Sequence, residues 1–131
     1  MKKDIESPED IKLLVDSFYA KVKTDPLIGY IFTEVARVNW EKHLPVMYSF
    51  WENALFYTGG YGGNPMKVHA HLHRLAKLNP DHFRQWNLLF SATVDELFFG
   101  EKALLAKEKA LSISTVMQVK LFDGPVQGEI T

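Results

Sequence analysis

The sequence predicts an all-α fold, and three features support this class. Apolar residues recur at steps of three and four along most of the chain, the spacing that gathers side chains on one face of a helix. Serine or asparagine precedes a proline where several of these runs begin, as a helix cap precedes a first-turn proline. The apolar and polar alternation typical of strands is almost absent. The 131 residues suffice for one hydrophobic core, so we expect a single domain over residues 1–131.

The first helix is expected over residues 8–24. A serine cap, a first-turn proline and two early acidic residues stand at positions 7–10. Asp25-Pro26 then restarts the chain in a short turn or single-turn helix through Ile31-Phe32, and a loop follows. The apolar positions of the first helix share one face: Ile11, Leu14, Val15, Phe18 and Val22.

A second helix is indicated from Trp40 onward, and His43 falls on its apolar face. Pro45 is unfavourable there, because a proline past the first turn lacks a backbone donor and clashes with the preceding turn. The sequence leaves two alternatives. Either the helix starts near His43, or it is kinked.

Residues 57–65 contain four glycines in five positions and are expected to form an exposed loop. Asn64-Pro65 then predicts the start of a helix that carries three histidines. The same signal recurs at Asn79-Pro80, which begins a helix that ends at Gly100. A last helix follows from Glu101, and the tail beyond it is expected to fray. The total is five or six helices.

Composition excludes several functions. The 15 basic and 16 acidic residues give a net charge of -1, which argues against binding to nucleic acid or to an acidic membrane surface. The chain has no cysteine, so it has no disulfide, thiolate metal site, thiol nucleophile or covalent haem attachment. It also shows no export signal and no apolar run long enough to cross a membrane. We therefore expect a cytoplasmic location.

The histidines are the first place to look for chemistry. His69 and His73 are four residues apart and share a helix face, whereas His71 points away from it. A zinc pair is geometrically possible, but further ligands are missing and no His-Glu-x-x-His run occurs. No motif for hydrolysis or phosphate binding is present. His71 and His82 are expected at the surface.

A different set of residues fits an apolar pocket for a flat iron cofactor. One histidine lies on the run just described, and His43 lies on the apolar face of another helix. Tyr19 and Trp86 lie in apolar stripes, and their polar tips are costly to bury without a partner. Each of them alone also fits a core aromatic residue with a satisfied polar atom.

Four motifs in order resemble those of the group III truncated haemoglobins. They are FYAKV with DPLIGYIF, EKHLPVMYSFW, NPMKVH and DHFRQWNLLF, and the resemblance extends from about Ile5 to Phe122. The resemblance implies a truncated globin, an all-α two-over-two helical sandwich around a haem pocket. It also implies a non-covalent haem b with its iron as the cofactor.

The resemblance also implies roles for individual residues. His69 corresponds to the histidine that binds iron through Nε2, and His73 is the alternate, because both spacings to Trp86 are admissible. Tyr19, His43 and Trp86 correspond to the distal set that faces the ligand. Phe32 would pack against the porphyrin edge, and the distal helix would supply three further wall residues: Met47, Phe50 and Trp51.

The distal set suggests how ligands are held. Each donor that reaches a ligand with partial negative charge should contribute about 1.5–3 kcal/mol, and its loss should speed ligand escape by about ten- to a hundredfold. Tyr19 and Trp86 are the expected donors, while His43 either donates or gates the pocket.

Two or three donors would hold dioxygen too long for a good carrier. We therefore expect reversible binding of dioxygen, nitric oxide and carbon monoxide for ligand chemistry or sensing. The ligand chemistry would be nitric oxide dioxygenation or a peroxidase-like reaction, supported by an unidentified reductase. The alternative is a helical binding or sensor module whose apolar pocket holds no haem.

Overall fold

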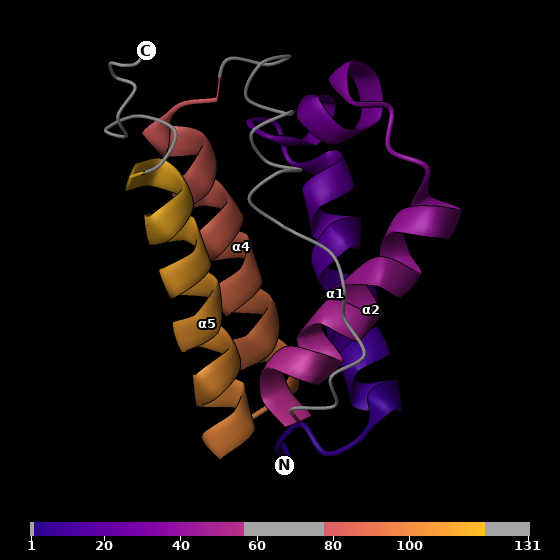
Figure 1. Cartoon of the computed structure of the whole chain (residues 1–131), viewed down its shortest axis with the longest axis vertical. Helices are drawn as coiled ribbons and strands as arrows, with labels where there is room; N and C mark the ends of the chain where they lie inside the picture. Colours follow the sequence, from indigo (N-terminus) through magenta and orange to yellow (C-terminus); the bar gives the residue numbers. More distant parts are fainter. Residues whose placement is uncertain (1, 57–77, 120–131) are drawn as a thin grey trace.

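The computed structural model describes residues 2–56 and 78–119 (Figure 1). No strand occurs in these ranges, and the predicted all-α class is confirmed. The predicted glycine-rich loop, the helix expected from Asn64 and the C-terminal tail lie outside the described residues. The described ranges contain five helical segments: α1 (Pro8–Thr24), η1 (Ile31–Val35), α2 (Trp40–Phe56), α4 (Pro80–Leu97) and α5 (Glu101–Gln118).

Helix α1 has the bounds that the sequence predicts. Ser7 Oγ accepts a hydrogen bond from the backbone N–H of Asp10 at 3.3 Å, which satisfies one of the free donors at the helix start. Pro8 occupies the first turn, where its missing N–H costs nothing. The local cap and the apolar spacing therefore suffice to place this helix.

Asp25 sets the change of direction after α1. Its carboxylate accepts hydrogen bonds from the backbone N–H groups of Leu27 and Ile28 at 3.0 Å each. A Cβ on Gly29 would lie 2.8 and 2.9 Å from two carbonyl oxygens of α1, so the close approach of the turn requires glycine. The turn leads into η1, a short π-helical segment that begins at Ile31, near the end of the predicted single turn, continues beyond Phe32 to Val35 and buries Phe32.

Helix α2 begins at Trp40, so the alternative of a start near His43 is wrong. Asn39 holds the first turn, because its backbone carbonyl accepts from the His43 N–H at 2.8 Å and its Oδ1 accepts from the Glu41 N–H at 3.1 Å. Pro45 lies inside the helix and removes the bond to the Glu41 carbonyl. Both residues are exposed, so water can satisfy that carbonyl.

Helix α4 begins with the predicted Asn79 cap, in a reciprocal form. Asn79 Oδ1 accepts from the His82 backbone N–H at 3.2 Å, and His82 Nδ1 accepts from the Asn79 backbone N–H at 3.1 Å. His82 is only 9% exposed, so the expectation of a surface histidine is wrong. Its ring turns back to satisfy a backbone donor at the helix start.

Helix α5 begins at the predicted residue, after Gly100 with a φ of 147°. A positive φ of this size favours glycine, because other residues rarely adopt it. Asp4, from the segment before α1, accepts from the backbone N–H groups of Lys102 at 2.9 Å and Ala103 at 2.8 Å. Burial alone would raise the pKa of Asp4, but these bonds lower it below its usual value. The N-terminus of the chain is thus attached to the start of α5.

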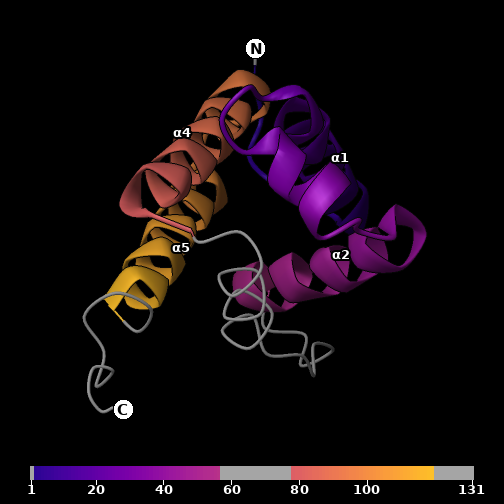
Figure 2. The same ribbon diagram turned by 90° about the horizontal axis from the view of Figure 1, so that it is seen from above.

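The helices form two pairs, the expected two-over-two arrangement. Helix α1 packs on α2, and α4 packs on α5, while contacts of α1 with α4 and of α2 with α5 join the pairs. Figure 2 shows α1 beside α2 on one side of the molecule and α4 beside α5 on the other. None of the described helices is both long and apolar enough to cross a membrane.

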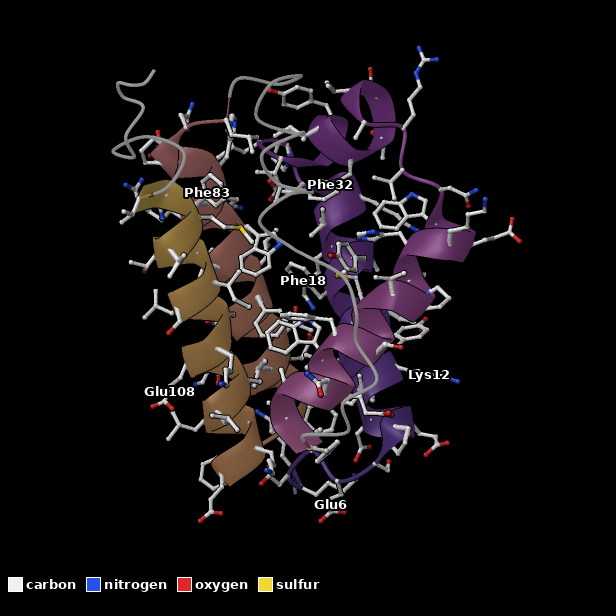
Figure 3. All side chains as sticks on the ribbon, in the orientation of Figure 1. Glu6, Lys12, Phe18, Phe32, Phe83 and Glu108 are labelled. Carbon is white, nitrogen blue, oxygen red and sulfur yellow. The ribbon has the colours of Figure 1, made fainter. Side chains whose placement is uncertain are left out.

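The core lies between the two pairs. Phe18 and Phe32 point into this space, whereas Lys12 and Glu108 point outward (Figure 3). Leu14 and other residues of the α1 face predicted from the spacing are buried, together with Phe90 and Val94 of α4. The packing of the helices around this core determines the positions of the predicted site residues on α1, α2 and α4.

Candidate functional site

Two of the predicted distal residues meet directly. Tyr19 lies on the core face of α1, and His43 lies in the first turn of α2. The Tyr19 hydroxyl and His43 Nε2 are 3.3 Å apart, a hydrogen bond whose donor depends on the tautomer of the imidazole. The two rings meet nearly at right angles, with centroids 5.2 Å apart. The packing of α1 on α2 creates this pair.

The Tyr19 side chain is buried among aromatic rings. The residue is 7% exposed, and burial raises the pKa of Tyr19 far above its usual value. The hydroxyl therefore keeps its proton across the physiological pH range. His43 is only half-buried, so this bond joins a buried hydroxyl to a partly solvent-accessible imidazole.

Trp86 belongs to the same aromatic cluster but does not lie directly beside Tyr19. Phe18 contacts both, with ring centroids 4.9 Å from Tyr19 and 5.6 Å from Trp86. Trp86 is half-buried and stacks on Phe90 at 5.9 Å. The three predicted distal residues thus form one directly bonded pair and one separate indole.

A small apolar cavity lies next to this cluster. Phe32 connects the two, because it lines the cavity and its ring centroid lies 6.2 Å from that of Tyr19. The cavity volume is about 30 Å³, enough for a small molecule of diatomic size. Its walls are almost entirely apolar: Ile28, Ile31, Phe32, Leu78, His82, Phe83, Trp86, Ser114 and Met117.

The three wall residues predicted on α2 differ in their environment. Met47 and Phe50 are half-buried and pack against the core. Trp51 is 4% exposed and stacks on Phe90, with centroids 4.7 Å apart. These contacts are compatible with a core role and with a cofactor wall, and the wall role stays a prediction.

Two residues of the cluster were not predicted as site residues. The Trp40 indole contacts the rings of Tyr19, His43 and Phe32, with centroids 5.3, 5.7 and 6.3 Å away. Lys23 Nζ lies 4.4 Å from the centroid of the same indole. Helical spacing gives a signal for Trp40, which precedes His43 by three residues. Lys23 had no such signal, because its contact depends on how α1 packs on α2.

The predicted iron ligand His69 and its alternate His73 lie outside the described residues, as does His71. Within residues 2–56 and 78–119, no three histidine, aspartate or glutamate side chains form a group that could hold a metal ion. The iron ligand therefore stays a prediction, and of the predicted site only the residues expected on the distal side and the wall are described.

Comparisons with known proteins show a similarity along nearly the whole chain. A curated relative described as "Group 3 truncated hemoglobin ctb", from Campylobacter jejuni, is 27% identical over 125 residues, which cover 93% of this chain and 96% of the relative. The crystal structure of a group III truncated haemoglobin from Campylobacter jejuni superposes with a TM-score of 0.80, at 27% identity and the same coverage of each chain. No protein-family model matches the sequence.

Proposed function

The chain belongs to the group III truncated haemoglobins in sequence and fold, and on this premise we propose that it binds haem b without a covalent link and handles diatomic ligands. The family supports a globin haem-binding role. His69 is the proposed iron ligand, with His73 as the alternate. The proposed distal residues are Tyr19, His43 and Trp86.

The lining of the small cavity is compatible with one edge of a haem and supports the proposal. The cavity beside Phe32 and Trp86 is lined by apolar and aromatic side chains, as the edge of a porphyrin requires. Its volume of about 30 Å³ is too small for a whole macrocycle, so the rest of the site depends on other parts of the chain.

The observation that carries the proposal is the bond between the Tyr19 hydroxyl and His43 Nε2 at 3.3 Å. Iron in haem supplies reversible binding of diatomic molecules and a partial negative charge on dioxygen. When His43 Nε2 carries its proton and donates to the tyrosine oxygen, the Tyr19 O–H is left to donate to a ligand. Because this donor is buried, one such bond should contribute about 1.5–3 kcal/mol to ligand retention.

Strong retention favours ligand chemistry or sensing over bulk oxygen storage. We propose dioxygen, nitric oxide and carbon monoxide as ligands, with nitric oxide dioxygenation or peroxide reduction as the candidate reactions. Conversion of nitric oxide and dioxygen to nitrate takes up one electron, which an unidentified reductase would supply. A chain without cysteine fits a reducing compartment, and we propose the cytoplasm.

Haem uptake tests the proposal. The purified full chain, titrated with haemin and reduced, should give a sharp Soret band at one haem per chain. The His69→Ala variant should lose the band, and the matched variant His73→Ala should keep it. The reverse result would move the iron ligand to His73.

A haem-free apolar module is the alternative, and the small apolar cavity is the observation that favours it. A parent protein that stays colourless with haemin would refute the haem proposal. Binding of xenon to the same protein, detected by chemical-shift changes around Phe83 and Met117, would then support the alternative.

A further inference from the structure

We propose that Trp40, held in place by Lys23, is a positioning residue that keeps the imidazole of His43 against the Tyr19 hydroxyl. This inference rests on the proposed function and adds to it two residues that the family resemblance did not assign. It is carried by the contacts of the Trp40 indole, which meets each ring of the distal pair and has a cation over it.

The position of Trp40 restricts the imidazole. Side chains on a helix lean toward its N-terminus, over the residues three and four positions earlier. The His43 ring therefore leans over Trp40, and the two rings meet at 81° with centroids 5.7 Å apart. The T-shaped contact is a favoured geometry for aromatic pairs. Rotation of the imidazole toward solvent would break it.

Trp40 is itself fixed from several sides. Its ring stacks on that of Phe32 with an interplanar angle of 29°, and it is tilted against the ring of Tyr19. The side of the indole that faces the core is therefore packed. The exposed Lys23 of α1 places its ammonium 4.4 Å from the ring centroid, in cation–π range. Lys23 thus links α1 to the first residue of α2, directly beside the distal pair.

On this inference, Trp40 decides between two orientations of His43. A half-buried histidine at a helix start can turn toward Tyr19 or toward water, and its ligand-competent fraction scales the apparent binding rate. A bulky indole on one side favours the inward orientation. Loss of the indole should therefore increase the outward population, move the imidazole away from the proposed ligand site and weaken the bond to Tyr19.

The test compares the parent with Trp40→Ala, Trp40→Phe, Lys23→Met and Lys12→Met. Lys12→Met is the matched control, because Lys12 Nζ lies 5.9 Å from the Tyr48 ring centroid and makes the same kind of contact between α1 and α2, away from the distal pair. The first readout is histidine NMR of the full chain, with Overhauser effects from the His43 ring to the Tyr19 and Trp40 rings. The second is carbon monoxide association to the ferrous haem protein after flash photolysis.

We expect Trp40→Ala to abolish the His43–Tyr19 Overhauser effect and to raise the association rate by about five- to tenfold, since an open state populated to about 10% becomes the major one. Lys23→Met should raise the rate by about two- to fivefold, the size of an exposed cation–π contact. Trp40→Phe should restore part of the parental behaviour, and Lys12→Met should match the parent.

Unchanged His43 signals and rates in Trp40→Ala and Lys23→Met, with an intact Soret band, would overturn the inference and leave the proposed function standing. If Trp40→Ala does not fold, Lys23→Met and Trp40→Phe decide the result. A parent that takes up no haem would refute the proposed function. The NMR comparison, which needs no haem, would still decide whether Trp40 orients His43.

Discussion

The molecule uses buried polar groups differently in two regions along α1. Near the start of α1, Asp10 accepts hydrogen bonds from Lys3 Nζ at 2.5 Å and from the Glu6 backbone N–H at 2.8 Å, and Asp4 accepts from the first turn of α5. Near its other end, Tyr19 is bonded to a side chain of another helix. In the first region the carboxylates satisfy backbone donors and one lysine ammonium, while in the second region the bond joins only two side chains.

This difference separates stability from function. Removal of a carboxylate that caps a helix leaves backbone donors unsatisfied, and the free energy of unfolding decreases. Removal of the Tyr19 hydroxyl removes one bond to a half-buried imidazole that solvent can reach, and no backbone donor loses its acceptor. The Tyr19–His43 bond thus contributes little to folding, and its effect is expected in ligand binding.

The largest expected effect is on ligand release from the Tyr19→Phe variant. Without the hydroxyl, dioxygen should dissociate about ten- to a hundredfold faster, because one hydrogen bond to a partly charged ligand is lost. Stopped-flow displacement by carbon monoxide measures the rate. The free energy of unfolding should change by less than about 1 kcal/mol.

Trp86→Phe should also speed release, and because both donors would bond to the same ligand, its effect should couple to that of Tyr19→Phe in the double variant. If neither variant released dioxygen faster than the parent, the distal assignment would be wrong.

The second effect is on stability, from Asp4→Ala. Its carboxylate accepts from the backbone N–H groups of Lys102 and Ala103, so its loss should lower the free energy of unfolding by about 1–2 kcal/mol, as for other helix caps. Urea denaturation followed by circular dichroism measures this. The rate of ligand release should match that of the parent. If Asp4→Ala changed the rate of release as well as the free energy of unfolding, the separation of stability from ligand binding between the two regions would be wrong.

A smaller effect is expected from acid, which should lower the free energy of unfolding. The pKa values of Asp4 and Asp10 are lowered in the folded protein by hydrogen bonds that outweigh their burial. The unfolded chain therefore takes up protons first, near the usual pKa of about 3.9, and stability falls as the pH drops from about 5 through the folded pKa values. Asp4→Asn removes one of these carboxyls and should make the fall shallower. Urea denaturation between about pH 5 and about pH 3 gives the free energy of unfolding at each pH. If this free energy fell as steeply with pH in Asp4→Asn as in the parent, the assignment would be contradicted.

The elements that the sequence predicts well are those with local signals. Ser7 and Asn79 caps with adjacent prolines place α1 and α4, because capping bonds connect residues only three apart. Pro45 shows the limit of such rules. It disfavours a continuous helix, yet its exposed position in α2 lets water satisfy the freed carbonyl.

The contacts that the sequence could not predict are those between helices. The pairing of Tyr19 with His43 depends on how α1 packs on α2, and only the family resemblance suggested it. The burial of His82 and the contact of Lys23 with Trp40 depend equally on side-chain direction and helix packing. Neither is encoded in the spacing of apolar residues.

The smallest effect is expected from Tyr48→Phe, which removes the second tyrosine hydroxyl that joins α1 and α2. Tyr48 donates to the exposed Asp16, and burial together with this carboxylate raises the pKa of Tyr48 to about 12. The pair should contribute about 0.2–1 kcal/mol to stability, lost as the pH rises through that value. Dioxygen release should be unchanged. If Tyr48→Phe accelerated release as much as Tyr19→Phe, the cause would be the loosened contact between α1 and α2, and the position of the Tyr19 hydroxyl would not explain ligand retention.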